Sequence, residues 1–191
     1  MPIYIRAYVP GGTFFFTLVT YQRQPLLVQL LVRHLLRDAI RSVRTERPFH
    51  IDAFVLLPDH LHTLWTLPAG DADFSTRWRL IKHATTRQLM QHITVEIAQS
   101  ASRCKKQEQP VWQRRFWEHA VRSEEEFSAL CDYIHYNPVK HGYARCPHAW
   151  PYSSFRRFVH AQRYPLNWLC TCMGAPRVEP TFAIADDITG E

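Results

Sequence analysis

The N-terminal half of the chain contains short apolar runs that are typical of strands, separated by one segment with helical periodicity. Residues 13–21 (TFFFTLVTY) follow the Gly11-Gly12 turn and are rich in aromatic and β-branched side chains, which favours a strand. Pro25 then opens a predicted helix that extends to about residue 43. The apolar positions of this helix recur every four residues: Leu27, Leu31, Leu35 and Ala39.

Two further strands are predicted after this helix, in residues 50–58 (HIDAFVLLP) and 60–68 (HLHTLWTLP). Both runs are apolar and rich in residues that fit a pleated sheet. Because only Pro58-Asp59 interrupts them, an antiparallel hairpin is the simplest connection between the two strands.

The C-terminal half is predicted to begin with a second helix and to continue through a loop into a fourth strand. Ser75 or Thr76 is the expected cap of a helix that runs from about Arg77 into the nineties. Residues 100–110 (SASRCKKQEQP) are polar and show no periodicity, so an exposed loop is expected there. The fourth strand is expected around residues 116–121.

A third helix is predicted from Ser123, because a hydroxyl followed by three glutamates suits the start of a helix. It is expected to end near Pro138, since a proline disfavours the α conformation of the preceding Asn137. The order β-α-β-β-α-β, followed by this additional helix, predicts an α+β fold. Its form is a ferredoxin-like, RRM-like sandwich, a four-stranded antiparallel sheet with helices on one face. Residues 1–160 are assigned to this domain and residues 161–191 to an irregular tail.

Composition adds a preference for an anionic partner. The chain has 191 residues, of which 46% are hydrophobic, enough for the core of one domain. Its 23 Lys and Arg exceed its 17 Asp and Glu and give a net charge of +6, which favours nucleic acid before membrane. One basic stripe on the first helix is either a solvated face or a phosphate-facing rim: Arg33, Arg37, Arg41 and Arg44.

The cysteines and the apolar runs indicate in which cellular compartment the protein is expected. The five cysteines are scattered, and Cys170 and Cys172 are one residue apart instead of at the zinc spacing C-x-x-C, which favours reduced thiols. The N-terminus has no apolar signal core, and no run approaches the roughly eighteen apolar residues of a membrane helix. We expect a soluble, cytoplasmic protein without a membrane partner.

Two histidines in the third predicted strand are the first candidates for chemistry. His60 and His62 lie two residues apart, so both imidazoles leave the same face of the strand, whereas Leu61 and Trp65 point into the helix layer. Two imidazoles on one face can bind a divalent cation if a third ligand arrives. The alternative is that both rings sit on a solvated sheet face or merely accept hydrogen bonds.

The third helix offers a second group of candidates. Tyr133 and Asn137 are spaced i, i+4 and share one helical face, with Tyr136 on a neighbouring edge. If this face packs over the histidines, the Tyr133 phenol can approach a metal-bound phosphate and the Asn137 side-chain oxygen can complete the metal site. The alternatives are a core aromatic and a helix cap, and Glu118 and His119 compete as the third metal ligand.

Five sequence blocks occur together in one order: GGTFFFTLVT, LPDHLHTLWTLP, WQRRFWEHAVR, DYIHYNPVKHG and WPYSSFRR. In this combination the chain resembles the single-tyrosine HUH transposases, and more narrowly the bacterial transposases associated with repetitive extragenic palindromes (REP). The resemblance spans residues 11–158, and residues 91–110 and the tail after residue 164 have no matching block.

The resemblance implies roles for particular residues. It makes His60 and His62 the metal pair, Asn137 a further metal ligand and Tyr133 the nucleophile that forms a 5′-phosphotyrosine with single-stranded DNA. It implies Mg²⁺ or Mn²⁺, which also suit an amide oxygen and phosphate oxygens, while the imidazole pair suits Zn²⁺ too. The implied substrate is a single-stranded DNA hairpin of the REP type. No nucleotide cofactor is expected, and the sequence lacks G-x-x-x-x-G-K-[ST].

Basic and aromatic residues near these blocks are candidate DNA contacts. Phosphates could be bound by Lys82, Arg87, Arg114, Arg115 and Lys140, and bases could stack on Trp112 and Phe116, although aromatics at this density also suit a core. Two other functions remain open: a nucleic-acid-binding module without catalysis, and a metal-dependent nuclease that uses water. A monomer and a dimer are equally compatible with the sequence.

Overall fold

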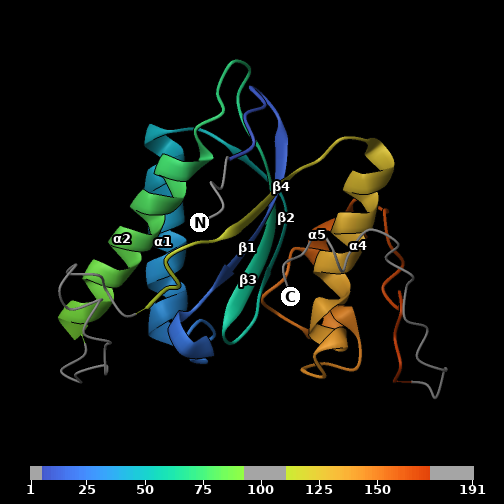
Figure 1. The fold of residues 1–191 in the computed structure, drawn as a ribbon. Coiled ribbons are helices and arrows are strands. Elements are labelled where there is room, and N and C mark those ends of the chain that lie inside the picture. The colour runs from blue at the N-terminus through green and yellow to red at the C-terminus, as the bar shows by residue number, and fades with distance from the viewer. Residues whose placement is uncertain (1–5, 93–110, 173–191) are drawn as a thin grey trace.

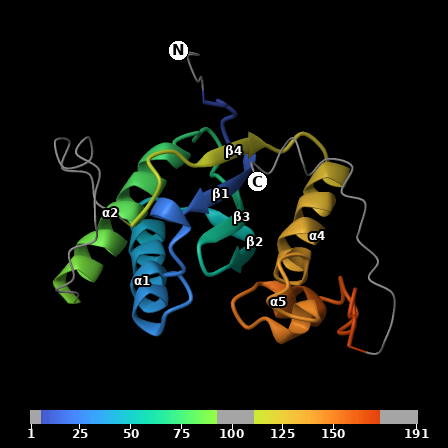
Figure 2. The ribbon, with the colours of Figure 1, turned by 60° about the horizontal axis from the view of Figure 1, so that its bottom comes forward.

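A four-stranded antiparallel sheet with the order β2-β3-β1-β4 lies at the centre of the computed structural model, which describes residues 6–92 and 111–172. Its strands are β1 (Thr13–Val19), β2 (His50–Leu56), β3 (His60–Thr66) and β4 (Trp117–Ala120). β2 and β3 form the predicted antiparallel hairpin. The predicted α+β architecture is therefore confirmed, and Figures 1 and 2 show helices flanking the sheet on both sides.

One face of the sheet packs against helices α1 (Leu30–Glu46) and α2 (Phe74–His92). Leu61 and Trp65 point into this layer as predicted, and the Trp65 and Trp78 rings stack with centroids 3.9 Å apart. Phe16 meets both tryptophans edge-on. Burying a phenylalanine side chain in this way stabilises a fold by roughly 1.5–3 kcal/mol. This layer fixes one side of β3, so the alternate side chains of the strand must face the opposite layer.

Helix α1 begins at Leu30, five residues later than predicted from Pro25. Leu27 is buried, but in the turn before the helix, where its N–H donates to the Pro58 carbonyl. The predicted spacing counted from Leu27 therefore started outside the helix. It is wrong at Leu31, which is 38% exposed, whereas Leu35 is partly buried and Ala39 is buried. The buried positions of the helix are Val32, Leu36, Ala39 and Val43.

Helix α2 begins at Phe74, three residues before the predicted start. Its cap is Asp73, whose carboxylate accepts a hydrogen bond from the Thr76 N–H at 3.0 Å, so the predicted caps Ser75 and Thr76 lie inside the helix. The predicted loop at residues 100–110 lies outside the described residues. Within residues 6–92 and 111–172 no helix has the length and apolar character needed to span a membrane.

The opposite face of the sheet packs against helix α4 (Glu124–Lys140) and the short helix α5 (Phe155–His160). The predicted start of α4 is confirmed, because the Ser123 side chain accepts a hydrogen bond from the Glu126 N–H. The helix continues two residues past Pro138, since the His141 N–H still bonds the Asn137 carbonyl at 3.0 Å. A proline this close to the end of a helix removes one hydrogen bond without preventing the final turn.

The first part of the predicted tail packs on this second layer. The Tyr164 hydroxyl donates a hydrogen bond to the Asp132 carboxylate of α4, and the Tyr164 ring stacks on Trp168 with centroids 4.5 Å apart. Phe155 and Phe158 of α5 also stack with the Tyr164 ring, with centroids 5.5 Å from it in each case. Residues 161–172 thus lie against the layer that contains α4.

Candidate active site

His60 and His62 lie on the face of β3 that α4 covers. Their ring centroids are 5.0 Å apart, and the two residues are 1% and 0% exposed, so the solvated-face alternative does not apply. The next residue on that face, Leu64, packs with Leu130 and Ile134 of α4. The two imidazoles share one face of β3, as the strand alternation predicted, and α4 covers that face.

A hydrogen bond orients each imidazole. His62 Nδ1 lies 2.9 Å from Thr17 Oγ1 on β1, and His60 Nδ1 lies 2.7 Å from an Asp59 carboxylate oxygen. Partial burial works against the charged form of Asp59, but hydrogen bonds and charges from His60 and Arg23 outweigh it and lower the pKa of this carboxyl. With Nδ1 engaged on both rings, Nε2 is the atom that each ring offers to a cation.

Tyr133 of α4 faces the histidine pair. Its ring lies against His62 with centroids 5.2 Å apart and against Phe15 at 6.0 Å, and the residue is 1% exposed. The Lys140 ammonium lies 5.0 Å from the Tyr133 ring centroid, two turns along the same helix. A phenol, two imidazoles and a cationic side chain thus gather at one place between β3 and α4.

Asn137, one turn after Tyr133, is completely buried. Neither its side-chain oxygen nor its side-chain nitrogen has a hydrogen-bond partner among residues 6–92 and 111–172. An unsatisfied buried polar group costs about 1–3 kcal/mol, so a ligand that the amide oxygen could bind would relieve a real penalty. Two imidazole nitrogens and an amide oxygen form a donor set that fits a divalent cation.

The competing ligands Glu118 and His119 do not join this group. Glu118 lies opposite Phe16 of β1, and the Phe16 ring belongs to the α1–α2 layer. The Glu118 side chain therefore points away from the histidine pair, and it forms an ion pair with Arg6. The His119 side chain points to the same layer as α4, but it comes from β4, which lies two strands away from β3. Its Nε2 lies 2.7 Å from a Glu126 carboxylate oxygen. Asn137 is the best placed of the three candidates, because it lies on α4 one turn after Tyr133, which faces the histidine pair.

His141 is a site residue that the sequence did not single out. Its ring centroid lies 5.1 Å from that of His60, and it caps the C-terminus of α4. It follows Asn137 by four residues and Tyr133 by eight, so helical spacing places it on the same face. Because the helix was predicted to end near Pro138, the sequence did not place His141 on the helical face of Tyr133 and Asn137.

The predicted DNA contacts divide between surface and core. Trp112 is 4% exposed and belongs to the α1–α2 core, and the Phe116 ring packs against Phe16 beneath the Arg6 guanidinium. The burial of Trp112 corrects the expectation that its ring stacks on bases, whereas Phe116 is partly buried and already has the Arg6 guanidinium over its ring. Lys82 donates to the Gln113 carbonyl at 2.6 Å. The remaining basic candidates are exposed: Arg87, Arg114, Arg115 and Lys140.

Comparisons with known proteins agree on one kind of protein. The family described as Transposase IS200 like matches residues 11–137. The chain is 42% identical over 168 residues to the REP-associated tyrosine transposase of Escherichia coli, covering 88% of this chain and 91% of that protein. A second relative, from Haemophilus influenzae, is 40% identical over 169 residues, covering 88% of this chain and 93% of that protein. A solved REP-associated tyrosine transposase bound to a REP hairpin superposes with a TM-score of 0.74 at 41% identity, covering 88% and 91%.

Proposed function

The chain belongs to the IS200-like transposases, and among them to the REP-associated tyrosine transposases, and we propose that it cleaves and rejoins single-stranded DNA through Tyr133. One observation carries the assignment of the nucleophile: the Tyr133 ring lies against His62, on the face of α4 that also carries the unsatisfied amide of Asn137. A buried phenol beside three candidate metal ligands is a site for phosphate chemistry.

His60, His62 and Asn137 would hold a divalent cation, which we propose to be Mg²⁺ or Mn²⁺ because amide and phosphate oxygens are hard ligands. Such an ion, when bound, would polarise the scissile phosphate and stabilise negative charge on its oxygens. Thr17 and Asp59 would keep the two imidazoles in position through their Nδ1 atoms.

In the proposed reaction the Tyr133 oxygen forms a bond to phosphorus while the bond from phosphorus to the 3′ oxygen breaks. The phenol gives up its proton, and the departing 3′ oxygen gains one to become a hydroxyl. Lys140, above the Tyr133 ring, would favour the negative charge that develops on the phenol oxygen and the phosphate. The 5′-phosphotyrosine retains the bond energy, so the 3′ hydroxyl of another strand can attack it and regenerate the phenol.

We propose a DNA hairpin of the REP type as the substrate, because the solved relative is bound to one. A groove of about 640 Å³ beside the β2 edge offers a surface for its phosphates. Its cationic and imidazole side chains come from α1, β2 and α5: Arg33, His34, Arg37, Arg41, Arg44, His50 and Arg157. Arg33 stacks on Tyr152 and Arg44 donates to the Phe49 carbonyl, whereas Arg37 and Arg41 are exposed. The groove supports the phosphate-rim interpretation of the α1 stripe.

Replacing Arg41 with alanine is expected to weaken hairpin binding about threefold to tenfold, and to lower the dependence of affinity on salt, because a phosphate contact is lost. Fluorescence anisotropy with a labelled hairpin at two or more salt concentrations measures both effects. Arg79→Ala is the matched control, since Arg79 is exposed on α2 and does not line the groove. Equal weakening in the two variants would mean that net charge alone matters and that the groove is not the binding surface.

The catalytic proposal is tested by incubating the purified protein with a labelled single-stranded hairpin and Mn²⁺, and then analysing the mixture under denaturing conditions. We expect a protein–DNA adduct that maps to Tyr133 by peptide mass spectrometry, together with a fragment that ends in a 3′ hydroxyl. Cleavage without an adduct would favour a nuclease that uses water. Binding without cleavage would favour a non-catalytic binding module.

A further inference from the structure

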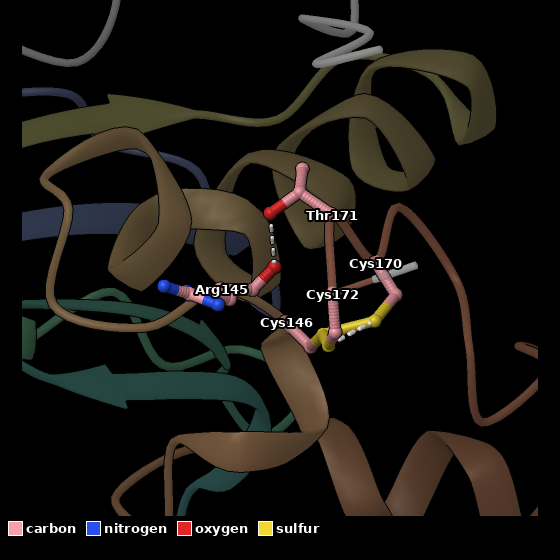
Figure 3. Close-up of a disulfide and its surroundings, with 5 residues drawn as sticks. All are labelled: Arg145, Cys146, Cys170, Thr171 and Cys172. Atoms are coloured by element: carbon pink, nitrogen blue, oxygen red, sulfur yellow. Dashed lines mark hydrogen bonds between the residues drawn. A yellow bond between two sulfur atoms is a disulfide. The ribbon is translucent and has the colours of Figure 1, made fainter. Parts of the chain in front are cut away.

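Three cysteine sulfurs converge where the end of the described chain meets the turn after α4. Cys146 precedes the short helix η2 (Pro147–Ala149), and its sulfur makes bonding contact with both Cys170 and Cys172 (Figure 3). The sulfurs of Cys170 and Cys172 lie 2.7 Å apart. A sulfur atom can take part in only one disulfide, so a single disulfide does not account for three sulfurs that meet at one point.

A histidine completes the cluster. The ligand atoms of Cys146, His148 and Cys170 all lie within 4.8 Å of one another. His148 Nδ1 is buried and has no hydrogen-bond partner among residues 6–92 and 111–172. Cys146 is completely buried, whereas Cys172 lies at the surface, so the cluster has a closed side and an accessible side. An imidazole beside the Cys146 and Cys170 sulfurs, with the Cys172 sulfur 2.7 Å from that of Cys170, is an arrangement for a shared cation.

We propose that Cys146, His148, Cys170 and Cys172 bind a structural Zn²⁺ ion as a closed Cys₃His site. Thiolates and imidazole are the ligands that zinc prefers, and four of them complete its tetrahedral shell. Binding would release three thiol protons and leave the site with one negative charge. The ligands follow the pattern C-x-H and C-x-C, which departs from C-x-x-C, so the sequence indicated only reduced thiols.

The ion would fasten the tail to the layer that carries the active-site helix. The backbone N–H and hydroxyl of Thr171 both donate to the Arg145 carbonyl, at 3.0 and 2.8 Å, and hold the tail beside the turn after α4. Earlier in the same segment, the Tyr164 hydroxyl donates a hydrogen bond to the Asp132 carboxylate of α4. The site is built from other residues than the histidine pair of β3, and its role is to stabilise structure.

Zinc content is the direct measurement. The full chain, produced without a metal-binding tag and kept reduced, is expected to contain about one Zn²⁺ per molecule by elemental analysis. Cys146→Ser and His148→Ala should each reduce this to a small fraction. Cys131→Ala should keep its zinc, because burial raises the pKa of the Cys131 thiol to about 12 and this thiol forms no disulfide with the other cysteines of residues 6–92 and 111–172. Replacement by Co²⁺ should add the visible absorption bands of a tetrahedral thiolate site.

His148→Ala separates a metal site from a disulfide, because a disulfide does not need an imidazole. If Cys146→Ser prevents folding, Cys172→Ser provides the second variant, since Cys172 is exposed and its loss should weaken zinc binding without loss of the core. Zinc that persists in Cys146→Ser would overturn the proposal. Zinc-free protein with Cys146 disulfide-bonded to Cys170 or Cys172, as shown by peptide mapping, would overturn it as well. Neither readout depends on DNA cleavage.

Discussion

Tyr133→Phe is expected to abolish formation of the covalent DNA adduct, with a loss of at least about 1,000-fold in cleavage rate, because the substitution removes only the attacking oxygen. The ring stays, so its contacts with Phe15 and His62 should persist and the variant should fold. Hairpin affinity should change little, since a buried phenol oxygen contributes little to contacts with the DNA backbone. Cleavage on denaturing gels and binding by anisotropy measure the two effects separately.

Tyr136→Phe is the matched control for this variant. Tyr136 lies on the same helix and is 2% exposed, so the two substitutions delete one buried hydroxyl each. If Tyr133 is the nucleophile, the Tyr136 variant should form the adduct at a rate within a few-fold of the wild-type protein. Loss of the adduct in Tyr136→Phe, together with its survival in Tyr133→Phe, would move the nucleophile by one helical turn and refute the assignment.

Much of this site could be predicted from the sequence because it follows from local periodicity. The alternation of a strand fixes His60 and His62 on one face, and helical spacing places Tyr133 and Asn137 one turn apart. These relations hold wherever the strand and the helix pack. The packing of α4 over the histidine face could be expected only through the family resemblance, because no local pattern states which side of a sheet a helix covers.

The errors arose where tertiary contacts override local signals. Leu27 continues the helical spacing but lies in a turn, so the predicted apolar stripe of α1 includes Leu31, which is exposed. Trp112 and Phe116 flank a basic segment, yet Trp112 is buried in the α1–α2 core and Phe116 packs against that core, partly buried. In each case the deciding fact is which layer the side chain meets, and that depends on residues far away in the sequence.

The cysteine cluster shows the same limit for a site. Cys146 and Cys170 are 24 residues apart, and neither belongs to a spacing pattern that indicates zinc. Tertiary contacts bring the two segments together: Tyr164 and Trp168 pack on α4 and α5, and Thr171 donates hydrogen bonds to the Arg145 carbonyl. A search for short motifs therefore does not detect a metal site that tertiary packing assembles.

Removing either histidine of the pair is the second large expected effect. His60→Ala and His62→Ala should each lower the cleavage rate by at least about 100-fold in Mg²⁺ or Mn²⁺, because two imidazoles and one amide leave no spare ligand. Chelation of divalent ions should have the same effect on the wild-type protein, and added Mg²⁺ should restore activity. Hairpin binding should stay measurable in both variants, since the groove proposed to bind phosphates lies beside β2 and neither ring lines it.

His119→Ala provides the control that separates the metal site from a general effect of losing a histidine on this face of the sheet. His119 lies two strands from β3 and bonds Glu126, so its loss should leave metal-dependent cleavage within a few-fold of wild type. Full cleavage by His62→Ala would show that this imidazole is not a ligand. If the His62 variant lost hairpin binding together with cleavage, as judged beside a thermal melt that confirms folding, the pair would belong to DNA binding. If His119→Ala alone lost activity, the metal ligands would have to be reassigned to residues of β4.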